Sequence, residues 1–113
     1  MKEFLFIFRN DYNALAGRSP EEMQSMTKRW MDWIGDIAAQ NKLSNRGNRL
    51  ENAGKVVKGT NVVTDGPYIE IKESIGGYTI VSSSSIDDAV ELAKGCPIFT
   101  TGGNVEVREI SVL

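Results

Sequence analysis

The sequence predicts an α+β fold, a ferredoxin-like βαββαβ antiparallel sheet with two helices on one face. Residues 2–9 and 78–81 are strand-like runs that are apolar on both alternating faces. Residues 19–41 and 85–97 carry helix start signals and helical apolar spacing. With 113 residues and no internal repeat or linker, the chain is expected to form one domain, residues 1–113.

The first predicted strand is KEFLFIFR, residues 2–9. Phe4, Phe6 and Phe8 form one alternating set, and Leu5 and Ile7 form the other. Both faces of this strand are therefore apolar and need cover.

The first predicted helix follows a loop and begins at Ser19, the expected N-cap. Pro20 suits the first helical position, and Glu22 completes a capping box. Gly35 costs a helix about 1 kcal/mol relative to Ala, so we expect close packing there. Residues at spacings of three and four predict one apolar face: Met23, Met26, Trp30, Trp33, Ile34 and Ile37.

The middle of the chain is less regular. Residues 41–61 mix Gly, Asn and charge, which predicts a loop plus a strand or hairpin of undetermined register. Gly76 and Gly77 precede a strand and lack a phosphate-loop context, so they predict a bulge or tight turn.

The second predicted helix begins after Ser85 as its N-cap, and Asp87 and Asp88 suit the positive end of its dipole. Gly95 and Pro97 are expected to end it. Its predicted inward face consists of Ile86, Ala89, Val90 and Ala93.

Residues 103–113 predict an edge strand, in which Val105 and Val107 alternate with Glu106 and Arg108. Two helices can cover only one face of a four-stranded sheet, yet two of the strands are apolar on both faces. The sequence therefore predicts a homodimer that pairs sheet to sheet.

Composition indicates an ordinary soluble domain, with 41% hydrophobic and 25% charged residues. The apolar run Phe4–Phe8 is too short for a signal peptide or a membrane span, and a single cysteine agrees with a cytoplasmic protein. A net charge of −2 offers no broad basic surface, so neither nucleic acid nor membrane is an expected partner.

The absence of histidine restricts the chemistry most. It excludes Ser-His and Cys-His nucleophile pairs, His-ligated haem and His-based zinc sites. Carboxylates, Lys, Tyr and Cys remain as proton carriers, and no metal or other cofactor is expected. Cys96 has no motif that would activate its thiolate, which favours a structural role.

Several separated motifs resemble the YCII-related family, in its branch with a DGPF-type motif. They are SPEEM at the helix start, TDGPY at residues 64–68, Gly76-Gly77-Tyr78, DDAVELAKGCP and VEVRE. The resemblance implies a dimeric α/β barrel. A few members of the wider family resemble small lyases or isomerases that use a His-Asp pair; this chain keeps Asp65 but has no histidine, and Tyr68 replaces the usual Phe.

Asp65 is the candidate catalytic residue, with two interpretations. It is either a turn former bonded to nearby backbone N–H groups, or a carboxylate at the mouth of a cleft between sheet and helix, usable as an acid or base. Its neighbours Gly66, Pro67, Tyr68, Glu70 and Lys72 are candidate ligand-binding residues. The alternative is that Gly66 and Pro67 only form a turn and that Glu70 and Lys72 belong to a solvated face.

Two functions remain open. The first is a small-molecule site, catalytic or only binding, lined by Asp65, Tyr68 and apolar side chains. The second is a non-catalytic dimeric binding or regulatory module. Arg46 and Arg49 lie among Asn and Gly, which indicates a solvated loop, although they are also candidates for an anionic ligand.

Overall fold

The computed structural model of the chain describes residues 1–11, 15–66 and 74–113. Strands and helices follow one another from the N-terminus in this order: β1 (Lys2–Asn10), α1 (Pro20–Ala39), β2 (Leu43–Asn45), β3 (Gly54–Gly59), β4 (Val62–Gly66), β5 (Ser74–Ser83), α2 (Ile86–Ala93), the 3-10 helix η2 (Pro97–Thr101) and β6 (Asn104–Glu109).

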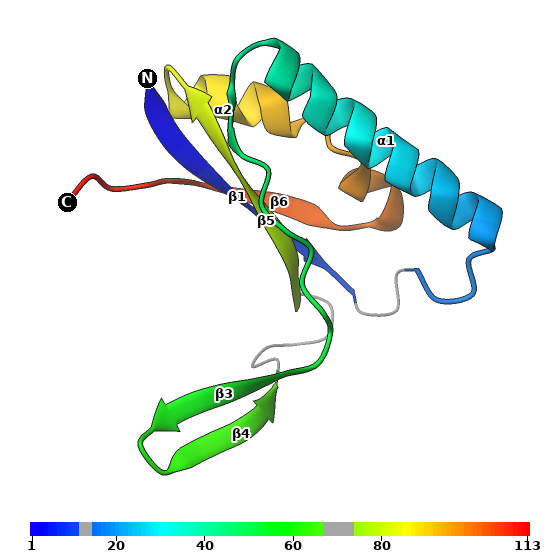
Figure 1. Cartoon of the computed structure of the whole chain (residues 1–113), viewed down its shortest axis with the longest axis vertical. Helices are drawn as coiled ribbons and strands as arrows, with labels where there is room; N and C mark the ends of the chain where they lie inside the picture. Colours follow the sequence, from blue (N-terminus) through cyan, green and yellow to red (C-terminus); the bar gives the residue numbers. More distant parts are fainter. Residues whose placement is uncertain (12–14, 67–73) are drawn as a thin grey trace.

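Four strands form the main sheet, in the order β2-β5-β1-β6 and with antiparallel neighbours. Both α-helices lie on the same side of this sheet (Figure 1). This arrangement confirms the predicted ferredoxin-like fold, and β6 lies at an edge as its alternation indicated.

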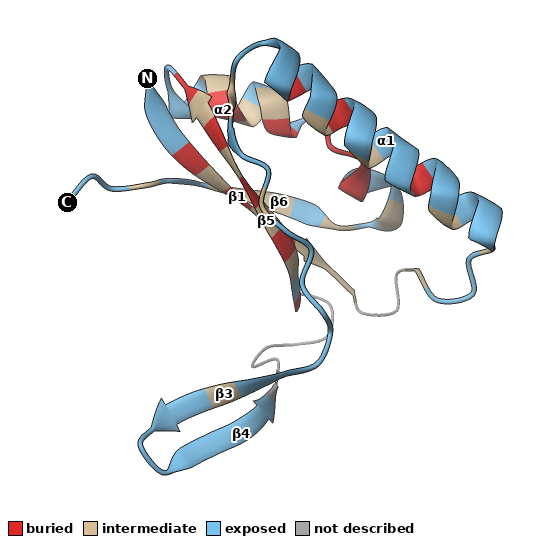
Figure 2. Ribbon diagram, viewed as in Figure 1, coloured by how far each residue is buried: buried red, intermediate tan, exposed pale blue. Residues whose placement is uncertain are grey.

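The remaining two strands, β3 and β4, form a separate antiparallel hairpin between β2 and β5. The hairpin projects away from the helices and the main sheet, and nearly all of it is exposed (Figures 1 and 2). Val57 and Val63 face each other across it and are 68% and 52% exposed. The predicted strand or hairpin within residues 41–61 is thus β2 and β3, and its partner β4 begins at Val62.

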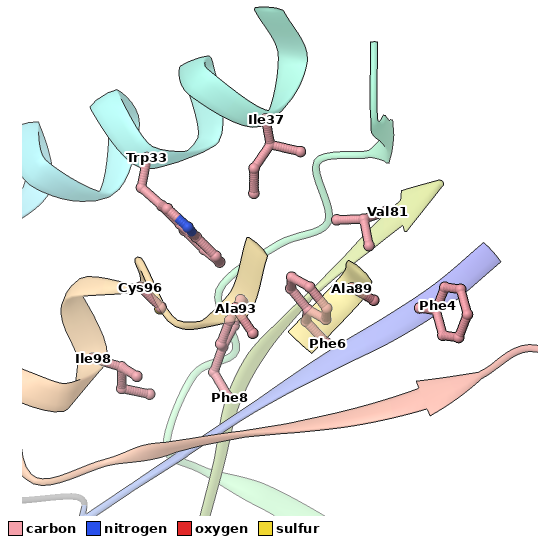
Figure 3. Packing of buried hydrophobic residues seen from close by; sticks show 10 residues of the cluster. All are labelled: Phe4, Phe6, Phe8, Trp33, Ile37, Val81, Ala89, Ala93, Cys96 and Ile98. Atoms are coloured by element: carbon pink, nitrogen blue, oxygen red, sulfur yellow. The ribbon is translucent and has the colours of Figure 1, made fainter. Parts of the chain in front are cut away.

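The core lies between the helices and the covered face of the sheet. Phe4, Phe6 and Phe8 of β1 point into it, and Trp33 stacks on Phe6 with ring centroids 6.2 Å apart (Figure 3). The indole N–H of Trp33 donates to the Leu92 carbonyl at 3.0 Å, which satisfies its polar atom. Burying one phenylalanine of this kind stabilises the fold by about 1.5–3 kcal/mol.

Helix α1 begins as the sequence predicts. The Ser19 hydroxyl accepts from the Glu22 backbone N–H at 3.1 Å, and the Glu22 carboxylate accepts from the Ser19 N–H at 3.4 Å. Its predicted apolar face is confirmed, since Met26, Trp33 and Ile37 are buried. The Ser85 cap of α2 is also confirmed, because its hydroxyl accepts from the Asp88 N–H.

Two local expectations are wrong. A Cβ at Gly35 would meet no atom within 4 Å, so close packing does not explain this glycine. Ile86 is 49% exposed, which leaves Ala89 and Ala93 as the buried residues of the second helix, α2.

Helix α2 ends where the sequence predicts, because Ala93 is its last residue and Lys94 is its C-cap, directly before Gly95 and Pro97. Gly95 also makes room for Trp33, which a Cβ would approach at 3.2 Å.

The sheet face opposite the helices, here called the open sheet face, carries a cross-strand apolar patch. Leu5 pairs with Ile80, and Ile7 pairs with Tyr78. All four are half-buried in the single chain. Their neighbours Phe4, Phe6 and Val81 are fully buried on the other face, so β1 and β5 are apolar on both faces, as predicted.

Candidate functional site

A pocket with a cavity volume of about 380 Å³ lies between α1 and the end of the sheet where β1 stops and β5 begins. The loop of residues 46–52 and helix η2 contribute further lining. Its volume falls in the usual range for small-molecule sites, about 300–1,000 Å³.

The inner wall of the pocket is apolar. Phe8 and Trp30 meet edge to face, with ring centroids 4.9 Å apart, and Trp30 meets Trp33 in the same way at 5.7 Å. Trp33 is buried in the core, as predicted, whereas Trp30 and Met26 also line the pocket. Among the described residues the Trp30 indole N–H has no hydrogen-bond acceptor. The wall therefore suits an apolar, ring-containing ligand.

The rim opposite α1 is formed by residues 46–50, which run along the beginning of β5. The Tyr78 N–H donates to the Asn48 carbonyl at 3.2 Å, and the Leu50 N–H donates to the Gly76 carbonyl at 2.8 Å. The Thr79 hydroxyl donates to the Arg46 carbonyl at 2.9 Å. These bonds fix the backbone of the rim against the sheet.

Two glycines permit this close approach. Gly47 has φ +70°, and a Cβ there would lie 2.6 Å from the Tyr78 carbonyl carbon. A Cβ at Gly77 would lie 2.8 Å from the Asn48 carbonyl oxygen. The β1–β5 register shifts between Phe8, which pairs with Gly77, and Arg9, which pairs with Ile75. The predicted bulge is therefore confirmed, and Gly76 is its extra residue.

The rim carries two guanidinium groups, those of Arg46 and Arg49, on exposed residues that line the pocket. Neither has an ion-pair or hydrogen-bond partner for its side chain in the described ranges 1–11, 15–66 and 74–113. The exposed loop inferred from the surrounding Asn and Gly is correct. What sequence reasoning missed is that this loop borders a pocket, because its hydrogen bonds to β5 join residues about 30 positions apart.

Asp65 lies in β4, paired with Lys55 of β3. The turn expected around Asp65 includes Pro67 and Tyr68, which lie outside the described residues, so this interpretation stays a prediction. The Asp65 side chain is 96% exposed, and one carboxylate oxygen lies 3.7 Å from the Lys55 Nζ. It is not among the residues that line the pocket. Gly66 ends β4 opposite Gly54, while Pro67, Tyr68, Glu70 and Lys72 lie outside the described residues.

Cys96 is shielded from solvent. Cys96 is buried in the core cluster, and burial raises the pKa of its thiol to about 12. This supports the structural role that its sequence context predicts, because the thiolate is the reactive form.

The part of the chain that the structure describes contains neither a metal-binding cluster nor a membrane-spanning helix. Those residues contain no group of three or more Cys, Asp or Glu side chains placed to hold a metal ion. None of the described helices has the length and apolarity to cross a membrane.

These features define the class of protein as a ferredoxin-like α+β domain with a mainly apolar pocket between its long helix and its sheet. The chain belongs to the YCII-related domain family, whose sequence pattern matches residues 3–113. No curated protein matches the sequence.

Among solved structures, the chain is similar to 5-chloro-2-hydroxyhydroquinone dehydrochlorinase from Burkholderia phenoliruptrix AC1100, in complex with 2,5-dihydroxybenzoquinone. The TM-score is 0.58 at 15% sequence identity, and the match covers 96% of this chain and 93% of the other. At this identity the likeness establishes the shared fold.

Proposed function

We propose that the protein is a homodimer that binds a small organic molecule in the pocket between α1 and the sheet. The observation that carries the proposal is the pocket itself, about 380 Å³ in volume, with an aromatic inner wall and a polar rim. Sites of this composition are the usual places for ligands in small domains. The dehydrochlorinase of similar fold, in complex with 2,5-dihydroxybenzoquinone, supports a ring-sized ligand.

The dimer part of the proposal rests on the open sheet face. Leu5, Ile7, Tyr78 and Ile80 form an apolar patch that neither helix covers. A second copy would cover it symmetrically and give the dimeric α/β barrel that the family resemblance implied.

Light scattering after size exclusion tests the dimer. The native chain is expected at twice the monomer mass, and Ile80→Lys at the monomer mass, because a charge in the patch opposes its burial. Ile86→Lys on α2 is the matched control, since Ile86 is already exposed on the helix side of the sheet. A native chain at the monomer mass would refute this part.

A carboxylate-based, lyase-like or isomerase-like role for Asp65 belongs to the same proposal, with Gly66, Pro67, Tyr68, Glu70 and Lys72 as ligand contacts. The support is chain continuity: residues 67–73 join Gly66 to Ser74, and Ser74 lines the pocket. Because Asp65 does not line its own chain's pocket, this role requires the hairpin to reach the pocket of the second copy.

The alternative is a non-catalytic dimeric binding or regulatory module. The position of Asp65 favours it, because the side chain of Asp65 is 96% exposed and lies outside the lining of the pocket. Once turnover of a ligand is found, Asp65→Asn decides between the two. Lost turnover supports the carboxylate site, and unchanged turnover leaves the binding module.

Thermal shift against a panel of ring-containing metabolites tests the pocket. A ligand at 100 times its dissociation constant stabilises the protein by about 2.7 kcal/mol. Thr27→Trp places a bulky side chain among the pocket-lining residues and should abolish the shift. Ser25→Trp, exposed on the same helix and outside the lining, should keep it. Equal shifts in the two variants would place the ligand elsewhere and contradict the proposal.

A further inference from the structure

We infer that Arg46 and Arg49 form an anion-binding subsite at the pocket rim, so that the ligand is an organic anion with an apolar, ring-sized body. This inference rests on the proposed small-molecule function and names the chemical class of its ligand. The shared chemistry is an oxyanion such as a carboxylate, sulfonate or phosphate, which a guanidinium recognises through paired N–H donors.

The two arginines differ from the other cationic side chains near the sheet. Most cationic side chains near the sheet have a carboxylate: Arg9 pairs with Glu106 at 3.1 Å, and Lys42 pairs with Asp88 at 3.2 Å. Arg46 and Arg49 have no such partner within the described ranges, although both line the pocket. Two neighbouring cations beside an apolar cavity generate a positive potential at its mouth.

The charge of the described pocket lining differs in sign from that of the whole chain. The charged residues in the described lining are Arg46, Arg49 and Asp11, which sum to one positive charge. The whole chain carries a net charge of −2. The described pocket lining is therefore positive although the protein as a whole is negative, and this difference favours negatively charged ligands over neutral ones.

The backbone of the rim is preorganised for ligand binding by its hydrogen bonds to β5. The carbonyls of Arg46 and Asn48 and the N–H of Leu50 all bond to β5, and Gly47 brings the backbone into direct contact with Tyr78. The two arginines thus lie on a stretch of backbone that is already fixed, so less backbone ordering opposes ligand binding. A solvated loop without these hydrogen bonds to β5 would have to become ordered when the ligand binds, which would weaken the binding.

The wall of the pocket opposite the rim is apolar. Phe8, Met26, Trp30 and Ile34 line the pocket and offer ring and aliphatic surface. A fully hydrated inorganic anion gains nothing from this surface, whereas an aromatic or alicyclic acid uses both the wall and the rim.

Two fluorescent probes separate the contribution of the two arginines to binding from that of the apolar wall. 8-Anilinonaphthalene-1-sulfonate and N-phenyl-1-naphthylamine share one ring system and differ by the sulfonate. Both brighten in an apolar site, so titration gives a dissociation constant for each. We expect the sulfonate probe to bind the native protein about tenfold more tightly than the neutral probe, and to lose most of this advantage in 0.5 M NaCl.

The decisive variant is the double substitution Arg46→Gln with Arg49→Gln. It should weaken binding of the sulfonate probe about tenfold or more and change binding of the neutral probe less than twofold. Arg29→Gln is the matched control, because Arg29 is an exposed arginine of α1 outside the pocket lining, and this variant should bind both probes like the native protein.

The results distinguish a failure of the anion subsite from a failure of the proposed function. If both probes bind but the double variant binds the sulfonate probe as tightly as the native protein does, the anion subsite is wrong and the pocket stands. If Arg29→Gln weakens binding as much as the double variant, the effect is general surface charge and the subsite is also wrong. If neither probe binds, the proposed function fails, and this inference fails with it.

Discussion

Gly47 lies against the backbone of Tyr78 so closely that a Cβ on Gly47 would be 2.6 Å from the Tyr78 carbonyl carbon. The contact joins the loop after β2 to β5, and φ at Gly47 is +70°. Both features demand glycine, one for steric space and the other for backbone conformation. This contact holds the arginine-bearing rim of the pocket in place.

We predict that Gly47→Ala destabilises the protein by about 2–4 kcal/mol, since it combines positive-φ strain with a backbone clash. Gly17→Ala separates the two effects, because Gly17 has φ +77° and open space around it. That control should cost only about 1 kcal/mol. Urea unfolding gives both values, and an equal cost for the two variants would show that the Tyr78 contact is unimportant.

A second prediction compares two valines in strands. Val81→Thr buries a hydroxyl in the core, where Val81 is 0% exposed, and should cost about 1–3 kcal/mol. Val63→Thr in the hairpin, where Val63 is 52% exposed, should change stability by less than about 0.5 kcal/mol. Chemical denaturation measures both. A large loss for Val63→Thr would mean that the hairpin packs against another copy of the chain.

Much of the fold was predictable because its signals are local. The Ser19 capping box, the apolar spacing of α1 and the two-sided apolarity of Phe4–Phe8 each depend on residues a few positions apart. The bulge at Gly76 was predictable for the same reason, since paired glycines before a strand favour such irregularity.

The candidate site was less predictable because its geometry is non-local. The sequence directed attention to Asp65, whose neighbours are turn-forming residues, yet pairing with Lys55 places it in an exposed strand. Arg46 was a candidate for an anionic ligand from the sequence, but its position at a pocket depends on the bond between its carbonyl and Thr79, 33 positions away. Gly35 and Gly95 show the same difficulty, because the space around a glycine depends on the tertiary neighbours.

A third prediction concerns Cys96. With a thiol pKa of about 12, only about one molecule in ten thousand carries the thiolate at pH 8. Iodoacetamide should therefore leave the folded protein unmodified over hours and alkylate it stoichiometrically in 6 M guanidinium chloride. Mass spectrometry of the intact chain measures both. Rapid alkylation of the folded protein would show that the thiol is accessible.

Cys96 also makes the stability of the folded protein depend on pH. The folded pKa of Cys96 lies above the value near 8.5 expected in the unfolded chain, so its stabilising contribution is complete below about pH 8.5 and is lost as the pH rises toward 12. Within that window the loss is about 1.4 kcal/mol per pH unit. Cys96→Ala should remove this part of the slope, and identical slopes in the two proteins would contradict the assignment.

The last prediction concerns Asp88, at the start of α2. Its carboxylate accepts from the Ser83 hydroxyl and pairs with Lys42 at 3.2 Å, and these two hydrogen bonds, Ser83 first, lower the pKa of Asp88. A carboxylate with a lowered folded pKa stabilises the fold above its unfolded pKa, near 4, and this contribution is lost as the pH falls through the folded value. We expect Asp88→Asn to lower the urea midpoint at pH 7, with the difference from the native protein shrinking below about pH 4.

Asp87→Asn is the matched control for this prediction. It removes a charge from the same helical turn without touching Ser83 or Lys42 and should leave the pH 7 midpoint nearly unchanged. If the two variants follow the same curve, the interaction that matters is the helix dipole and not the contact with Ser83 and Lys42.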